Sequence, residues 1–166
     1  MPSTHHFVGS THHVVTPTRR GDGAGDQTRT SAYAYYDDLT SLARDVEFLI
    51  VTAPGGPATR GIVNQEVLEA LGRNGVLINV ARGSIVDEPA LVDALRTGRI
   101  AGAGLDVFEH EPDIPDELKA MSNVVLEPHQ ASGTVEAHTA MTQLVIQNLR
   151  AHFAGTPLIS PLPNSA

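Results

Sequence analysis

Three residues in the second half of the chain carry side chains that together could do chemistry: Arg82, Glu111 and His129. A guanidinium presents a planar fork that can hold a carboxylate through two parallel hydrogen bonds. An imidazole can donate a proton near neutral pH, and a neighbouring carboxylate orients the ring and favours its protonated form. These are the groups needed to bind a 2-oxo acid and protonate its carbonyl oxygen while a nicotinamide cofactor supplies hydride.

Each of the three residues also has an ordinary interpretation when it is taken without its neighbours. Arg82 could be a surface side chain in a strand-to-helix turn, and His129 could be a common loop histidine. Glu111 lies among four other acidic residues in the segment 109–117 and could be one more solvated carboxylate. The surrounding sequence therefore has to decide between the two interpretations.

The composition limits the class of protein. The chain has 166 residues, of which 41% are hydrophobic and 18% charged, and this predicts a globular protein with a sizeable core. A net charge of −8 disfavours nucleic acid and anionic membrane surfaces as partners, and no apolar run is long enough for a membrane span. There is no cysteine for a disulfide or a metal site, and no secretory signal opens the chain, so we expect a cytoplasmic protein.

Hydrophobic periodicity and capping residues predict an alternation of strands and helices. Strands are expected over 46–53, 75–80, 101–107 and 123–126, and helices over 38–44, 64–71, 88–97 and from Ser132 or Thr134 to about 153. Asn64 and Asp87 are the expected N-caps of the second and third helices. Such an alternation is typical of an open parallel α/β sheet with flanking helices, which is a Rossmann-like fold.

The candidate residues fall at one edge of this expected sheet. Arg82, Asp106 and His129 each lie at or just past the carboxyl end of a predicted strand. Ligands bind at the carboxyl ends of the strands in open parallel sheets. The positions derived from periodicity therefore agree with the chemistry of the side chains.

Residues 48–163 resemble the C-terminal half of the D-isomer-specific 2-hydroxyacid dehydrogenases. The resemblance rests on the segments 79–83, 102–108, 109–112 and 124–129. Within that family the chain looks most like the hydroxypyruvate and glyoxylate reductases. The resemblance implies an enzyme that interconverts small 2-oxo acids and D-2-hydroxy acids with NAD or NADP.

The resemblance also implies a role for each candidate residue. Arg82 would bind the substrate and polarise its carbonyl, His129 would be the proton donor, and Glu111 would be the partner of His129. Asp106 would accept a hydrogen bond from the nicotinamide carboxamide. The full set of implied cofactor contacts is Ala53, Pro54, Thr59, Val80, Ala81, Arg82, Asp106, His129 and Ala131.

The same resemblance implies a homodimer that forms through the cofactor domain. A resident metal is not expected, because the adjacent histidines in the segments 4–6 and 11–13 are more typical of adventitious metal binding. Dinucleotide folds of this kind open with a G-x-G-x-x-G loop, and the nearest match, 21–26, has its third glycine one place early.

We therefore expect a partial fold that lacks the first βαβ unit and the substrate domain. Residues 1–32 are expected to be irregular and unrelated to the family, and residues 33–150 to form the C-terminal part of the NAD(P)-binding domain. Residues 151–166 would be a tail that returns to the missing substrate domain. The alternative function is a non-catalytic truncated remnant of the family or a dimerisation module.

Overall fold

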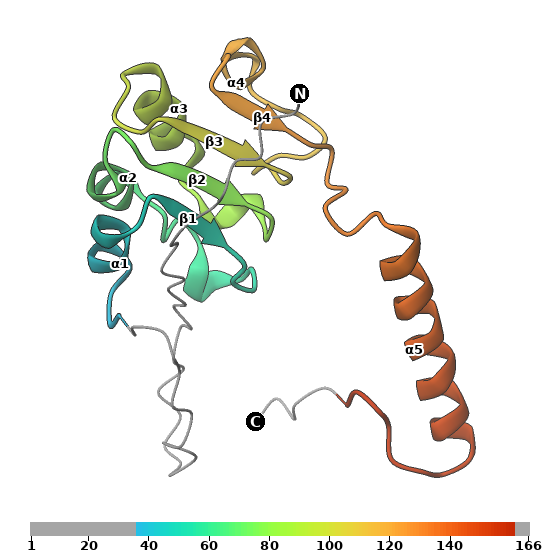
Figure 1. The fold of residues 1–166 in the computed structure, drawn as a ribbon. Coiled ribbons are helices and arrows are strands. Elements are labelled where there is room, and N and C mark those ends of the chain that lie inside the picture. The colour runs from blue at the N-terminus through green and yellow to red at the C-terminus, as the bar shows by residue number, and fades with distance from the viewer. Residues whose placement is uncertain (1–35, 162–166) are drawn as a thin grey trace, which may run out of the picture. The chain divides into compact units, whose positions relative to one another are not determined.

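The computed structural model describes residues 36–161, which fall into two compact units. The first unit ends at Pro128 and the second begins at His129. Figure 1 shows a sheet with its helices in the first unit and a long helix in the second. The expected irregular segment 1–32, with its two pairs of adjacent histidines, lies outside the described residues.

The first unit contains a four-stranded sheet in which every pairing is parallel. The strands are β1 (Phe48–Val51), β2 (Val76–Asn79), β3 (Gly102–Leu105) and β4 (Val124–Leu126), and they lie side by side in chain order. All four strands were predicted, and the predicted open parallel α/β fold is confirmed. Each strand is shorter than the apolar run that predicted it.

Capping residues begin the helices of this unit. The helices are α1 (Leu39–Asp45), α2 (Gln65–Leu71), α3 (Glu88–Arg96) and α4 (Asp116–Ala120), with short 3-10 turns η1 (Pro57–Thr59) and η2 (Gly83–Ile85). The side chain of Asn64 accepts the backbone N–H of Val67 at 3.1 Å, and Asp87 accepts that of Ala90 at 3.1 Å. Both predicted N-caps are therefore confirmed. Helix α1 packs against α2, and α2 packs against α3.

Helix α4 was not predicted, because the acidic segment around it was interpreted as a loop. Two of those acids, Asp116 and Glu117, form the first turn of the helix. Negative charge is favourable there, because it opposes the positive end of the helix dipole. Leu118, which is 1% exposed, anchors the helix in the core.

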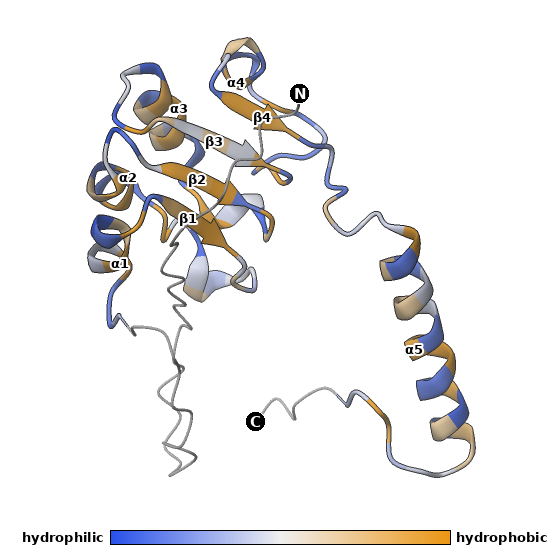
Figure 2. Ribbon diagram, viewed as in Figure 1, coloured by the Kyte–Doolittle hydropathy of each residue, from blue (hydrophilic) through white to orange (hydrophobic). Residues whose placement is uncertain are grey.

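The core lies on one face of the sheet. In register across the strands, Leu49, Leu77 and Ala103 are all buried, whereas Ile50 and Val125 on the other face are 56% and 65% exposed. Figure 2 shows the apolar character of β1, β2 and β4. The apolar run around β1 predicted a strand buried on both faces, but only alternate residues are buried within the described part of this unit.

The second unit is built on α5 (Val135–Phe153), whose side chains include none that is buried. Of the two predicted first caps, the structure selects Thr134, whose hydroxyl accepts the backbone N–H of Ala137 at 3.1 Å. The helix stops before Gly155, which has a φ of 64° and matches the predicted stop. No helix among residues 36–161 combines the length and the apolar character that a membrane crossing needs.

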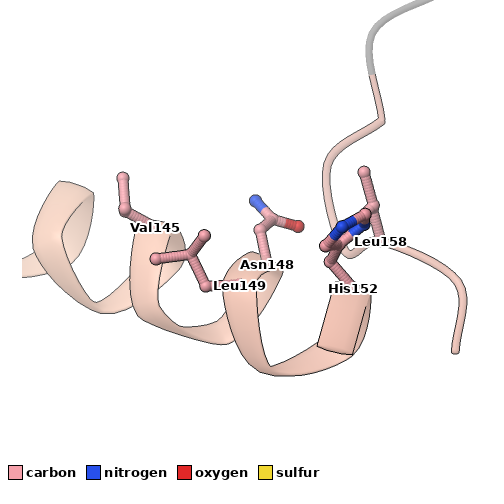
Figure 3. A pocket seen from close by; sticks show the side chains of 5 residues that line it. All are labelled: Val145, Asn148, Leu149, His152 and Leu158. Carbon is pink, nitrogen blue, oxygen red and sulfur yellow. The ribbon is translucent and has the colours of Figure 1, made fainter. Parts of the chain in front are cut away.

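The tail after α5 folds back on the last turns of the helix. The side-chain oxygen of Asn148 accepts the backbone N–H groups of Ile159 at 2.9 Å and Ser160 at 3.2 Å, and its amide donates to the hydroxyl of Ser160 at 2.7 Å. Figure 3 shows the open cleft that results, with Val145, Asn148, Leu149 and His152 projecting from the helix and Leu158 from the tail. A single asparagine side chain therefore holds residues 159 and 160 of the tail against the helix.

Candidate active site at the carboxyl edge of the sheet

A cleft of about 670 Å³ lies where β1 and β2 end. Its walls are the loop after β1 and the turn after β2, and its lining residues are Thr52, Ala53, Pro54, Gly55, Gly56, Val80, Ala81, Arg82 and Ser84. Five of these residues were predicted as cofactor or substrate contacts: Ala53, Pro54, Val80, Ala81 and Arg82. The structure brings these five together at the edge of the sheet where ligands of open parallel sheets bind.

Arg82 lies in the turn between β2 and η2 and is exposed at the cleft. One guanidinium nitrogen, Nη1, donates to the backbone oxygen of Ala81 at 2.6 Å. That bond uses one of the five N–H donors of the group. The flat guanidinium can thus present a fork of donors to an anion in the cleft.

Asn79 shapes this turn, and sequence reasoning assigned it no role. It is the last residue of β2 and is 1% exposed. Its Oδ1 accepts the backbone N–H of Ala81 at 3.1 Å, and its Nδ2 donates to the backbone oxygen of Arg82 at 3.0 Å. The signal in the sequence was an amide at the end of an otherwise apolar strand, because a buried polar group requires partners.

Gly55 gives the side chain of Arg82 its space. A Cβ at position 55 would lie 2.8 Å from Cγ and 3.3 Å from Cβ of Arg82. The aliphatic stem of Arg82 therefore lies directly against the backbone of the loop after β1. A larger residue at position 55 would displace the arginine.

Thr59 stabilises the same loop through its hydroxyl group. Its hydroxyl donates to the backbone oxygen of Pro54 at 2.7 Å and is 3.3 Å from that of Gly56, and the residue is 6% exposed. The contact of Thr59 with the cofactor, which the family resemblance implies, stays a prediction. In the structure its hydroxyl joins the two ends of the turn that borders the cleft.

Asp106 follows β3 directly and is 6% exposed. Its backbone N–H donates to the backbone oxygen of Asn79 at 3.0 Å, which continues the ladder between β2 and β3 by one residue. The carboxyl edge of the sheet thus places Asp106 beside the strand end that leads to Arg82. Its hydrogen bond to a nicotinamide stays a prediction.

Glu111 lies in the exposed loop between β3 and α4. Its Oε1 accepts the backbone N–H of Phe108 at 2.9 Å. The same loop is held by Glu88, whose Oε2 accepts the backbone N–H of Glu109 at 3.2 Å, and by an ion pair of 3.5 Å between Arg60 and Glu109. These bonds hold the carboxylate of Glu111 in a fixed place in its loop.

Gly83 joins the turn that carries Arg82 to the loop that carries Glu111. The residue is buried, and a Cβ added to it would overlap the carbonyl group of Phe108 and the backbone nitrogen of Glu109. The two backbones can come this close only because position 83 has no side chain. The predicted substrate-binding residue and the predicted histidine partner are therefore mechanically linked within the first unit.

His129 is the first residue of the second unit and lies three residues past the end of β4. It is exposed and has a φ of 55°, a left-handed conformation that is uncommon outside glycine. A turn follows it, in which the backbone N–H of Gly133 donates to the oxygen of Gln130 at 2.8 Å, with Ala131 between them. The pairing of His129 with Glu111, and the cofactor contacts of His129 and Ala131, stay predictions.

Residues 8–131 match the sequence model of the D-isomer specific 2-hydroxyacid dehydrogenase, NAD binding domain. The chain belongs to this family. It is 53% identical over 130 residues to hydroxyphenylpyruvate reductase of Plectranthus scutellarioides, which covers 78% of this chain and 42% of that protein. It is 51% identical over 131 residues to a glyoxylate/hydroxypyruvate reductase of Arabidopsis thaliana, covering 79% of this chain and 42% of that one.

Solved structures of 2-hydroxyacid dehydrogenases have the same fold. An NADPH-dependent glyoxylate/hydroxypyruvate reductase from Sinorhizobium meliloti, in complex with NADP and malonate, superposes with a TM-score of 0.80 at 46% identity. That match covers 90% of this chain and 44% of the other. The predicted family, the fold class and the nicotinamide dinucleotide as the family's cofactor are thus confirmed.

The match covers only part of each relative but most of this chain. The chain spans about two fifths of the length of the curated relatives described above, since 42% of each is covered. The family match begins at residue 8 and so includes most of the segment 1–32, which the composition had set apart from the family. Among the described residues, no group of three or more histidine, aspartate or glutamate side chains is arranged to hold a metal ion.

Proposed function

We propose that this 2-hydroxyacid dehydrogenase domain serves the NAD(P)-dependent reduction of glyoxylate, hydroxypyruvate or a related small 2-oxo acid to the D-2-hydroxy acid. The observation that carries the proposal is the guanidinium of Arg82 at the cleft beyond β1 and β2. The activities of two relatives that are about half identical to the chain, a hydroxyphenylpyruvate reductase and a glyoxylate/hydroxypyruvate reductase, support the same substrate class. A carboxylate is the part that glyoxylate and hydroxypyruvate share, and arginine is well suited to bind it.

The residues of the cleft fit a nicotinamide dinucleotide. Gly55 and Gly56 bring the backbone to one wall without side chains, and Val80, which is 40% exposed, supplies an apolar side chain at the other. Asp106 does not line the cleft, but its backbone is bonded to the end of β2, and its carboxylate would accept a hydrogen bond from the carboxamide of the cofactor. When bound, the cofactor supplies a hydride to the carbonyl carbon of the substrate.

The residues of the chain do the remaining work. Arg82 binds the carboxylate of the substrate and draws electron density toward the carbonyl oxygen through its positive charge. His129 donates a proton to that oxygen as negative charge develops on it. Glu111 orients the imidazole ring of His129 and favours its protonated form. We further propose that two copies of the chain pair through the cofactor domain and that the protein acts in the cytoplasm.

Oxidation of NADH and of NADPH by the purified chain, with glyoxylate and with hydroxypyruvate, tests the proposal. We expect turnover that falls by about 10²- to 10⁴-fold in His129→Asn, because a general acid contributes a factor of that size. His138→Asn is the matched control, since His138 is an exposed histidine on α5. A folded chain with no turnover on either cofactor would refute independent catalysis and favour the dimerisation module instead.

A further inference from the structure

Asn79 is a buried amide in an apolar setting. Its register partners on the neighbouring strands are Val51 in β1 and Leu105 in β3, and both are buried. An unpaired amide in such a place would cost free energy, so its hydrogen bonds determine why the position can hold asparagine. Neither of the two bonds of its side chain supports the sheet, because both go forward along the chain to the turn that follows.

The two bonds hold the peptide groups immediately before Ala81 and immediately after Arg82. The Oδ1 atom of Asn79 accepts the N–H of Ala81, and Nδ2 donates to the carbonyl oxygen of Arg82. That oxygen also accepts the N–H of Ile85 at 3.2 Å, which is the first bond of η2. Asn79 therefore connects the end of β2 to the start of η2 across Arg82.

The backbone of Arg82 lies beyond the paired residues of the sheet, since the last bond from this turn to β1 is that of the N–H of Val80 to the oxygen of Val51 at 3.4 Å. Its φ of −145° and ψ of 142° are extended, yet β2 has already ended at Asn79. The aliphatic stem of its side chain lies against the backbone of Gly55. The guanidinium is thus directed by its own bond to the backbone oxygen of Ala81, by the contact of its stem with Gly55, and, through the backbone of the turn, by the amide of Asn79.

We propose that Asn79 is a positioning residue for Arg82: its amide fixes the turn 80–82 so that the guanidinium meets a carboxylate in the cleft. Asn79 does not touch the substrate in this proposal and acts only through Arg82. The ligand that Arg82 holds rests on the proposed function, but the fixing of the turn does not. Displacing a binding group by about 1 Å can cost a factor of about 100, so the orientation of Arg82 has a measurable effect.

Two variants of Asn79 separate its two bonds. Asn79→Leu is similar in size and loses both bonds, whereas Asn79→Asp keeps the acceptor for Ala81 and loses the donor to Arg82. Leu77→Val, a fully buried change two residues earlier in β2, is the control for loss of stability without loss of the turn. If Asn79→Leu does not fold, Asn79→Asp still carries the test.

The first readout needs no ligand. Nuclear magnetic resonance follows the exchange of the backbone amide of Ala81 and the mobility of the Nε–H of Arg82. We expect exchange at Ala81 to rise about tenfold in Asn79→Leu, as for the loss of one hydrogen bond, and to stay near the wild-type rate in Asn79→Asp and Leu77→Val. Arg82 should become more mobile in both Asn79 variants.

The second readout is the affinity for oxalate, a dicarboxylate that cannot be reduced. We expect it to weaken about 10- to 100-fold in both Asn79 variants and to hold in Leu77→Val. Wild-type affinity in both Asn79 variants, or an unchanged Ala81 amide and Arg82 side chain in Asn79→Leu, would overturn the proposal. If the unmodified chain does not bind oxalate, the proposed function fails, and the ligand-free readout alone decides on Asn79.

Discussion

The contact at Gly83 makes a strong prediction about stability. Gly83→Ala places a methyl group onto the peptide that joins Phe108 to Glu109, and this peptide is backbone that has no other rotamer to adopt. Overpacking costs typically 1–3 kcal/mol, and a clash with backbone belongs at the top of that range. The N–H of this peptide, that of Glu109, donates to Oε2 of Glu88 at 3.2 Å. The N–H of the preceding peptide, that of Phe108, donates to Oε1 of Glu111 at 2.9 Å, so a displacement here would weaken both bonds.

We therefore expect Gly83→Ala to destabilise the first unit by about 3 kcal/mol, which lowers Tm by roughly 10 °C for a unit of this size. Circular dichroism in a thermal scan and in urea measures the change. Gly104→Ala is the matched control, because its Cβ would meet only Cγ1 of Ile78, at the ordinary distance of 3.9 Å. If the two variants unfold at the same temperature, the close approach of the two loops is not real and the proposed linkage fails.

Two further predictions concern the loop after β1 and the first helix. Thr59→Val should cost about 1 kcal/mol and speed exchange of the amides of Gly55 and Gly56, because the oxygen of Pro54 loses its donor, whereas Thr59→Ser should keep stability and exchange near their wild-type values. The backbone N–H and hydroxyl of Ser41 hold the pKa of the Asp38 carboxyl below its usual value, so its stabilising effect is present above about pH 4 and disappears as the pH falls through the lowered pKa. Acid unfolding should consequently be shallower in Asp38→Asn, and equal slopes in the two proteins would contradict this account.

Local signals made the helices predictable. Asn64 and Asp87 lie three residues before the N–H groups that they accept, so the whole interaction is contained in a short stretch of sequence. The ends of the strands depend on partners far along the chain. The apolar run 46–53 predicted eight residues of strand, but pairing with β2 covers only Phe48–Val51. Helix α4 was missed because its acids suggested a loop, although acids also favour a helix start.

The candidate site was predictable only in part, for the same reason. Arg82 and Asp106 follow the ends of adjacent parallel strands, and the alternation of strands and helices sufficed to place them at one edge. Gly55 and Gly83 act through contacts with Arg82 and with Phe108, which are distant in sequence. No pattern in a single sequence distinguishes such a glycine from one in an ordinary turn. Asn79 was seen only as a neighbour of Arg82, because its partners are backbone atoms.

These contacts explain how an exposed side chain can be held in place. The turn that carries Arg82 contacts the loop after β1 at Gly55 and the loop of Glu111 at Gly83. It is hydrogen-bonded to the side chain of Asn79 at the buried end of β2. The backbone oxygen of Asn79 accepts the backbone N–H of Asp106, so the ends of β2 and β3 are bonded to each other at this residue. A binding group supported by strands is held more precisely than one on a free loop. The fixed position that a carboxylate-binding arginine needs therefore comes from the sheet, and the hydrogen bonds of Asn79 connect the sheet to the turn of Arg82.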